Sequence, residues 1–493
     1  MFEWMPILKG KYFTAEQYLQ ILVLVNLLIF GLIFYKQKKF KNLVSITINL
    51  AILSFSWFGD FKYLSLIILI IYNRNSLSRI IIVVILYLLT YDVCFAMHNI
   101  DQGFIFSLDG AAFSTQFTRL FLDNNKFHSY ITLTQYHNAI IFNFQIQDQS
   151  NYVVYCNSVQ QRITNTKLYD RYVYHSVIKV DKQQNKIQIF DDSKLIGEYY
   201  YYDFNSTNIV IIDGGDSGYT ETSIQIWKAM ESLPQIDAIN IGGDVAYDNG
   251  FIQCTTCWDK FLDLYENLCK QKGKLIPLIF SIGNHDVGRV TDPQLLYNNQ
   301  QNSKVPNIIQ MFPQQLINKQ IPQVQDRTSY FVHRIGPINF ITIDSGYMTN
   351  SESQKEFLQN CIEKNKVNLV SYHVPVVPLQ VEDEKFLWNL GDELNKAVLV
   401  FEHHKHNFKR TKRIQVLKSD SKLKVYPGNT YYVGNGAMGI QSANKVEHAI
   451  IEKSSRQAHF WVYNYDNGLQ YVYAINKDGN RIDYFDIDQF KVK

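Results

Sequence analysis

From Asn208 onward the chain is a series of short apolar segments that alternate with helix-like stretches, and this pattern constrains its fold more than any other feature. Helix-like sequence covers Thr222–Leu233 and Trp258–Lys270. The apolar segments are IVII (209–212), AINI (238–241), PLIFSI (277–282), INFITI (338–343), NLVSY (368–372) and AVLVF (397–401). Strands that alternate with helices are typical of an α/β domain, and we predict one over residues 206–493.

Five of these apolar segments end directly in polar residues of the kinds that bind metals and phosphate. The residues are Gly215-Asp216-Ser217-Gly218, Gly243–Tyr247, Gly283–Asp286, His373-Val374-Pro375 and His403–His406. Open α/β sheets bind ligands just outside the carboxyl ends of their strands. A single histidine after a strand is more often structural, but five such turns in order favour one shared site.

The candidate ligands of this site combine hard oxygens with imidazoles. They are Asp216, Asp244, Tyr247, Asn284, His373, His404 and His406. This mixture suits borderline metals such as Fe, Zn or Mn, and it suits neither Ca²⁺ nor a thiolate site. Seven ligands are too many for one tetrahedral ion and fit two ions that share a carboxylate. Two ions about 3.5–4 Å apart can clamp a phosphoryl group and convert bound water to hydroxide.

His285 is not needed as a ligand in this scheme. It lies beside Asn284, and Asp286 is placed to orient its ring. We therefore predict that His285 and Asp286 are catalytic, with His285 as a general acid or a phosphate contact.

The order of these motifs resembles the calcineurin-like metallophosphoesterases, and within them the purple acid phosphatases. The elements GDxG, GDxxY, GNH(D/E), xxHxP and xHxHxxxR are matched by Gly215–Gly218, Gly243–Tyr247, Gly283–Asp286, His373–Pro375 and His404–Arg410. Tyr247 separates this branch from relatives that begin with Asp-x-His, because Gly218 stands where that histidine would be. The resemblance covers roughly residues 120–490 and implies a four-layer α/β/β/α metallophosphoesterase domain.

The resemblance also implies a role for each residue and two metal ions, Fe(III) and a divalent Zn, Fe or Mn. The implied ferric ligands are Asp216, Tyr247 and His406, the divalent ligands are Asn284, His373 and His404, and Asp244 bridges the two ions. The implied activity is hydrolysis of phosphomonoesters by attack of a metal-bound hydroxide. A phosphodiesterase on the same site and a non-catalytic membrane receptor or scaffold are the alternatives.

Three positions depart from the family pattern or leave it open. His403 stands where the last motif usually has glycine, and it either crowds the turn or is a bystander. Pro375–Trp388 contains no histidine to assist the leaving group, so that task would fall to His285 or solvent. Asp213 also begins an Asp-x-Gly sequence, but its spacing to Asp244 favours Asp216 as the ligand.

The segment before the α/β domain has a different texture. Runs such as YITLTQ, AIIFNFQI, NYVVYC and RYVYHSVIKV are β-branched and aromatic, and turns rich in Asn, Asp and Gln separate them. This spacing predicts a β-sandwich over residues 99–205. The family resemblance makes it similar to a fibronectin-III-like domain.

The first 98 residues differ from the rest in composition. They hold nine Lys and Arg residues and four acidic residues, a net charge of +5, while the remainder of the chain is net −2. Tyr18–Tyr35 is uncharged, and Arg79–Met97 has one interior charge. Both reach the roughly 17–25 residues of a spanning helix. With the shorter runs Leu43–Phe58 and Tyr63–Tyr72, we predict about four transmembrane helices; two spans with a buried or interfacial hairpin are the alternative.

The basic loops predict the orientation of these helices. Lys36–Lys41 and the pair Arg74 and Arg79 fall on one side of a four-span bundle, and the positive-inside rule assigns that side to the cytosol. We therefore expect an integral membrane protein that contacts the lipid bilayer through residues 18–97, with a lumenal or extracellular catalytic domain. The near-neutral remainder argues against nucleic acid as a partner. The family resemblance implies a phosphate ester as the substrate.

Cys254 and Cys257 form a Cys-x-x-Cys pair after the second motif. In an exoplasmic domain this favours a local disulfide, with Cys269 as an alternative partner. A redox site and a zinc knuckle are less well supported, because neither a thioredoxin-type context nor a second cysteine pair is present.

Overall fold

The computed structural model describes residues 127–168, 171–248, 255–287, 305–377, 388–419, 422–440 and 445–487. All of them belong to the second of the two compact units of the chain, Leu122–Lys493. The predicted membrane spans within residues 18–97 lie outside the described residues. Among the residues that are described, no helix is both long and apolar enough to cross a bilayer.

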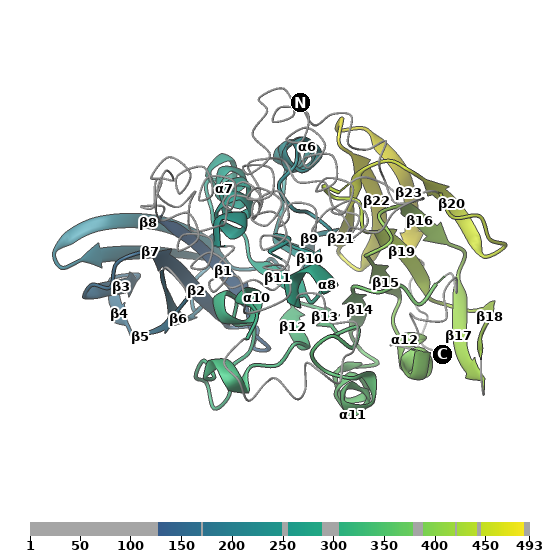
Figure 1. Cartoon of the computed structure of the whole chain (residues 1–493), viewed down its shortest axis with the longest axis horizontal. Helices are drawn as coiled ribbons and strands as arrows, with labels where there is room; N and C mark the ends of the chain where they lie inside the picture. The colour runs from purple at the N-terminus through teal and green to yellow at the C-terminus, as the bar shows by residue number, and fades with distance from the viewer. Residues whose placement is uncertain are drawn as a thin grey trace, which may run out of the picture. The chain divides into compact units, whose positions relative to one another are not determined.

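A ten-stranded mixed sheet runs through this unit (Figure 1), in the order β23-β22-β21-β9-β10-β11-β1-β2-β6-β5. Its strands are β1 (His128–Leu133), β2 (Ala139–Ile146), β5 (Ile163–Lys167), β6 (Tyr172–Lys179), β9 (Asn208–Gly214), β10 (Ala238–Gly242), β11 (Leu278–Ser281), β21 (His459–Asp466), β22 (Leu469–Asn476) and β23 (Arg481–Ile487). Strands β9, β10 and β11 are parallel. Their carboxyl ends therefore open at the same edge of the sheet.

A seven-stranded mixed sheet faces this one, in the order β12-β13-β14-β15-β19-β16-β20. Its strands are β12 (Phe331–Ile335), β13 (Ile338–Thr342), β14 (Val367–Tyr372), β15 (Leu399–Glu402), β16 (Phe408–Thr411), β19 (Tyr431–Asn435) and β20 (Ile451–Ser455). Asn240 of β10 donates to Ser371 Oγ of β14 at 2.9 Å, and Trp461 of β21 donates to the Gly434 carbonyl of β19 at 3.1 Å. These bonds tie the facing sheets together. A two-stranded ribbon of β17 (Ile414–Ser419) and β18 (Lys422–Pro427) forms a separate sheet.

Two helices that the sequence predicts, α6 (Glu221–Glu231) and α7 (Thr255–Lys272), are present and pack on each other. The ring of Trp227 in α6 meets the ring of Phe261 in α7 edge-on at 5.6 Å. The buried face of α7 carries Trp258, Phe261, Leu262, Tyr265 and Leu268, at the spacing of three and four residues that an amphipathic helix requires.

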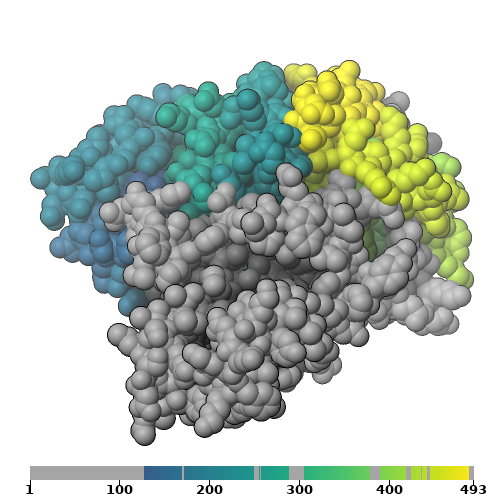
Figure 2. Space-filling view, turned by 45° about the horizontal axis from the view of Figure 1, so that its top comes forward, coloured from purple at the N-terminus to yellow at the C-terminus, as the bar shows by residue number. Residues whose placement is uncertain are grey.

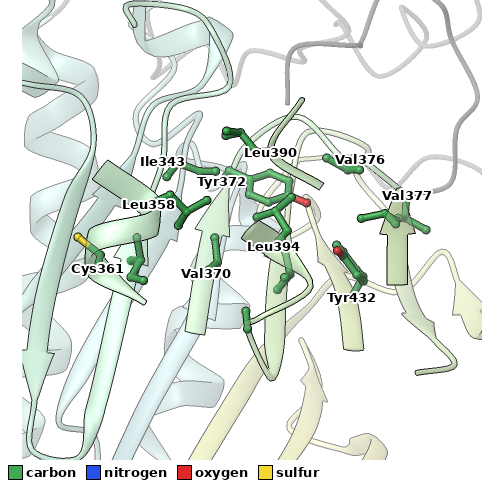
Figure 3. Close-up of a cluster of buried hydrophobic side chains, with 14 of the residues drawn as sticks. Ile343, Leu358, Cys361, Val370, Tyr372, Val376, Val377, Leu390, Leu394 and Tyr432 are labelled. Carbon is green, nitrogen blue, oxygen red and sulfur yellow. The ribbon is translucent and has the colours of Figure 1, made fainter. Parts of the chain in front are cut away.

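Helices α11 (Ser351–Cys361) and α12 (Gly391–Leu394) cover the opposite side of the seven-stranded sheet. Figure 3 shows Leu358 of α11 and Leu394 of α12 in one apolar cluster with Val370 and Tyr372 of β14. Side chains alternate along a strand, so Val370 and Tyr372 face these helices while Ser371 faces the ten-stranded sheet. Truncating Leu358 to alanine in this cluster would cost about 2–5 kcal/mol. The predicted α/β character is thus confirmed, with mixed sheets.

Residues 127–202 form a β-rich region, as the alternating pattern predicts. Four of its strands belong to the ten-stranded sheet, and a second sheet has the order β4-β3-β7-β8. The strands of this second sheet are β3 (Tyr152–Cys156), β4 (Val159–Gln161), β7 (Gln184–Asp191) and β8 (Lys194–Tyr202). Phe144 of β2 stacks on Tyr174 of β6 at 4.8 Å and meets Tyr152 of β3 edge-on at 5.5 Å. Aromatic contacts therefore join its two sheets.

The β-rich region shares its sheet with the α/β part. Strand β1 pairs in parallel with β11 at Thr132 and Leu278, so one sheet passes from one region into the other. Figure 2 shows the same succession on the surface, from the blue β-rich strands through teal segments to the yellow C-terminal strands. The domain boundary at residues 205–206 and the fibronectin-III-like character stay predictions.

Candidate metal centre

The predicted ligands lie where strands of the two facing sheets end. Asp216 follows β9, Asp244 and Tyr247 follow β10, and Asn284 begins the short helix α8 (Asn284–Val287) after β11. From the other sheet, His373 follows β14, and His404 and His406 follow β15. The structure brings all seven side chains together, in two groups.

The first group is centred on the Asp216 carboxylate. Its Oδ1 lies 2.8 Å from His406 Nε2 and 3.3 Å from the Tyr247 hydroxyl. Its Oδ2 accepts a hydrogen bond from the His404 backbone N–H at 2.9 Å. Burial and the nearby Asp216 and Asp244 carboxylates raise the pKa of Tyr247 well above its usual value, so the phenol keeps its proton and donates to Asp216.

The second group is centred on the Asn284 side-chain oxygen. His373 Nε2 lies 3.1 Å from this oxygen and His404 Nδ1 lies 3.0 Å from it. The two ring nitrogens are 3.2 Å apart, and Asp244 Oδ2 is 3.3 Å from His373 Nε2. Ligand atoms of Asp244, His373 and His404 all lie within 4.8 Å of one another.

These atoms have the chemistry of a cation site. Asp244 Oδ1 accepts from the His285 backbone N–H at 2.7 Å, whereas Oδ2 is buried without a hydrogen-bond partner. Burial opposes ionisation of Asp244, but the neighbouring His373 ring holds its pKa below the usual range, so the carboxylate is charged. A buried carboxylate oxygen that faces converging ring nitrogens and an amide oxygen is what a metal ion requires.

The backbone at the site is strained. Eleven non-glycine residues of the described part of the chain have positive φ. Five of these are candidate ligands: Asp216 (56°), Asp244 (52°), Tyr247 (56°), His404 (61°) and His406 (23°). Such conformations are costly for residues with a Cβ and gather at functional sites. The sequence shows no direct sign of this strain, because it depends on how each turn is held by its neighbours.

Asp286 accepts hydrogen bonds from the backbone of two loops. Its Oδ2 accepts from the backbone N–H groups of Gly283 and Asp244, both at 2.8 Å, and its Oδ1 accepts from that of Val245 at 2.9 Å. Asp286 therefore joins the loop after β10 to the loop after β11. Its predicted catalytic role stays a prediction.

The His285 ring packs against the ring of Tyr247, with centroids 4.6 Å apart. The residue is 3% exposed. Burial lowers the pKa of His285, and the Asp244 and Asp216 carboxylates offset only part of this effect. A neutral imidazole beside Tyr247 is therefore available at neutral pH.

Sequence reasoning missed a buried ion pair behind the His373 loop. Glu402 Oε1 accepts from the backbone N–H groups of Val376 and Val377 at 2.7 and 3.2 Å, and from the Tyr372 hydroxyl at 2.7 Å. Glu402 Oε2 lies 2.5 Å from Lys409 Nζ, and both side chains are buried. The only sequence signal is an acid at the end of an apolar strand, directly before His403-His404.

The predicted disulfide cannot be followed through the structure, because Cys254 lies outside the described residues. Cys269, the alternative partner, is a buried free thiol. Burial raises its pKa to about 12, which keeps the thiol protonated and unreactive.

Comparison with known proteins agrees with the fold. Residues 202–408 match the family model of the calcineurin-like phosphoesterases. The structure is similar to that of purple acid phosphatase PPD1 from yellow lupin (Lupinus luteus) seeds, with a TM-score of 0.56 and 14% identity over 73% of this chain and 74% of the lupin chain. No curated protein matches the chain in sequence.

Two more distant structures are also similar in part. PhoD has a TM-score of 0.49 and 9% identity over 73% of this chain and 92% of its own. GAP50, the anchor in the inner membrane complex of Plasmodium, has a TM-score of 0.39 and 14% identity over 58% of this chain and 90% of its own.

The described part of the chain thus has a metallophosphoesterase fold with mixed sheets. More specifically, the chain contains a calcineurin-like metallophosphoesterase domain. Members of this family are generally metal-dependent hydrolases that bind two metal ions.

Proposed function

We propose that the protein is a binuclear-metal phosphatase of the purple acid phosphatase type, and that it hydrolyses phosphomonoesters. The observation that carries this proposal is the division of seven ligand side chains into two groups, with ligand atoms of Asp244, His373 and His404 within 4.8 Å of one another in the second. Because Asp216, Tyr247 and His406 meet at one carboxylate oxygen, they would hold the ferric ion.

The second group would hold the divalent ion, Zn, Fe or Mn. Its ligands would be Asn284, His373 and His404, whose atoms lie 3.0–3.2 Å apart. Asp244 would bridge the two ions. When bound, two such ions supply Lewis acidity toward a phosphoryl oxygen and lower the pKa of water at the site.

The chain's own residues would bind and orient the ester. His285 lies at the Tyr247 side of the centre, and its backbone N–H is held by Asp244. Its neutral ring would donate a hydrogen bond to a phosphate oxygen or, once protonated, a proton to the leaving group. Asp286 would keep His285 in place by holding the backbone of Gly283 and Asp244.

The test is hydrolysis by the purified full-length protein loaded with Fe and Zn or with Fe and Mn, with metal content measured on the same sample. We expect two ions per chain and faster hydrolysis of p-nitrophenyl phosphate than of bis(p-nitrophenyl) phosphate. Faster diester hydrolysis would make the protein a phosphodiesterase. Metal-loaded protein without any hydrolysis would leave the receptor or scaffold alternative.

We also propose that residues 18–97 anchor the domain in a membrane, with the domain on the lumenal or extracellular side. The sequon Asn205-Ser206-Thr207 supports this orientation, because all three residues are exposed at a turn between β8 and β9. A glycosidase-sensitive mass shift that disappears in Asn205→Gln is the expected result. Cleavage of the catalytic domain by a protease added to the cytosolic side would contradict it.

A further inference from the structure

His403 directly follows β15 and directly precedes the candidate ligand His404, and its side chain lies between the two sheets. Its side chain is buried, with 1% of the residue exposed. The neighbouring His404 contributes to the second ligand group, whereas the His403 ring lies among the backbones of the ten-stranded sheet. The family that the sequence resembles has glycine at this position. A histidine ring is larger than glycine, so neighbouring residues must leave space for it.

Two glycines of the opposite sheet provide that space. A Cβ atom on Gly242 would overlap the His403 ring, and one on Gly215 would lie 2.6 Å from its Nδ1. Neither glycine has a positive φ, so its backbone would accept any side chain. The His403 ring is therefore the nearest obstacle to a larger residue at either position.

Polar side chains from both sheets surround the ring. His403 Nε2 lies 3.3 Å from Ser371 Oγ and 3.7 Å from Asp213 Oδ1. The Asn240 amide donates to Asp213 Oδ1 at 2.6 Å and to Ser371 Oγ at 2.9 Å. All four residues are buried. The Asn240 bonds and the His403–Ser371 contact therefore link β9 and β10 to β14 and β15.

The backbone around His403 leads directly to metal ligands. The carbonyl of Gly242, the residue whose Cβ position the ring occupies, lies 2.9 Å from His373 Nδ1. The His403 backbone N–H donates to the His373 carbonyl at 3.0 Å. Gly215, on the other side of the ring, immediately precedes Asp216. The His403 side chain thus packs against Gly242, which contacts His373, and against Gly215, which precedes Asp216. His373 and Asp216 belong to different ligand groups.

We propose that His403 is a positioning residue that sets the separation of the two ligand groups by filling the space at Gly215 and Gly242 and bonding to Ser371. It is not a ligand, and it acts through the backbone of its neighbours. The inference rests on the proposed function only in requiring that the site binds metal. Residues that orient metal ligands typically contribute 10–100-fold to metal affinity.

The first test compares His403→Ala and His403→Gln in the full-length protein. Zn²⁺ affinity is measured by competition with a chelating dye, and the visible spectrum is recorded with Co²⁺. We expect His403→Ala to weaken Zn²⁺ binding about 10–100-fold and to alter the Co²⁺ bands. His403→Gln, which keeps a polar group near Ser371, should recover most of the affinity. Wild-type affinity and spectrum in His403→Ala, with only a lower Tm, would overturn the proposal.

The second test adds a methyl group at Gly242, where it would collide with the His403 ring, and so does not depend on the cavity left by His403→Ala. Gly242→Ala alone should lose Zn²⁺ affinity, and Gly242→Ala combined with His403→Ala should bind no more weakly than His403→Ala alone. Gly243→Ala is the matched control, because Gly243 has φ +94° and its Cβ would lie 2.7 Å from the Gly283 backbone nitrogen. His403→Ala should not rescue that variant. A double variant that binds Zn²⁺ more weakly than His403→Ala alone would contradict the pairing.

Failure of this proposal is distinguishable from failure of the proposed function. Zn²⁺ binding and the Co²⁺ spectrum are measured without turnover. Wild-type protein that binds Zn²⁺ but hydrolyses no phosphate ester would overturn the proposed function alone. Wild-type protein that binds neither metal would overturn both.

Discussion

Two clusters of histidine and acidic side chains stand out in the described part of the chain, and they balance their charges differently. One is the candidate metal centre with Asp244, His373 and His404. The other contains His128 of β1 with Asp263 and Glu266 of α7. In each cluster the ligand atoms of the three residues lie within 4.8 Å of one another. Proximity alone therefore does not separate a metal site from an ion-pair cluster.

The charged groups around His128 differ from those at the metal centre. His128 Nδ1 lies 3.1 Å from Glu266 Oε2, and its Nε2 lies 3.4 Å from Asp259 Oδ1. The guanidinium of Arg171 also binds Asp259, with Nη2 3.0 Å from Oδ2. Burial opposes protonation of His128, but the hydrogen bonds to Asp259 and Glu266 outweigh it and raise its pKa to about 9.

The comparison shows that a second imidazole distinguishes the clusters. Around His128 the chain supplies an imidazolium and a guanidinium against Asp259 and Glu266. At the metal centre burial opposes protonation of His373, but the Asp244 and Asp216 carboxylates raise its pKa to about 9. Burial and the neighbouring His373 lower the pKa of His404 well below its usual value, so its ring nitrogen, 3.2 Å from that of His373, offers a lone pair. A metal ion that displaced the His373 proton would bind both rings and the carboxylate.

The largest expected effect comes from removing the proposed shared carboxylate. Asp244→Ala should lose both metals and all hydrolysis, because two cations would then repel each other in a partly desolvated site. Metal analysis and p-nitrophenyl phosphate hydrolysis check this. Asp263→Ala, in the His128 cluster, is the control and should keep both metals. Loss of metal in Asp263→Ala would break the distinction between the clusters.

His285→Ala should lower kcat by about 10²–10⁴-fold while both metals stay bound, because His285 would act on the ester and not on the ions. Steady-state kinetics and metal content of the same preparation check this. If His285→Ala lost metal as Asp244→Ala does, His285 would be part of the ligand set.

The His128 cluster should appear in the pH dependence of stability. The folded protein raises the pKa of His128 from 6.5 to about 9, so its contribution is complete below pH 6.5 and is lost as the pH rises through about 9. The shift corresponds to on the order of 3 kcal/mol. Denaturant unfolding of wild type and His128→Gln at pH 6 and pH 10 measures it. The same pH dependence in both proteins would show that His128 is not held as a cation.

The smallest effect on the fold is expected for Tyr247→Phe, which removes one hydroxyl and keeps the ring against His285. The lost bond to Asp216, at 3.3 Å, should change stability by about 1 kcal/mol or less. The iron-loaded wild type should be coloured by a phenolate-to-iron band that the variant lacks. A colourless, fully active wild type with divalent ions alone would rule out the ferric assignment.

The sequence by itself determined the candidate ligands and the alternation of strands and helices around them. Each motif is local: Asp216, Asp244 and His373 follow apolar strands directly, and the rule that such strands open at a common edge is enough to group them. The β-rich texture before residue 203 and the helices near Trp227 and Phe261 are local patterns too. The assignment of each ligand to one metal stays a prediction.

Only the tertiary structure decided which side chains have their charges met within the chain. Several decisive contacts join residues that are far apart in the sequence. They are the β1–β11 pairing, the bonds of Asp286 to a second loop, the fit of His403 against Gly242 and the contact of His128 with Glu266. A sequence pattern records the period of one segment and the chemistry of its residues. It does not record which segment lies opposite, and the energy of a buried charge depends on the atom that faces it.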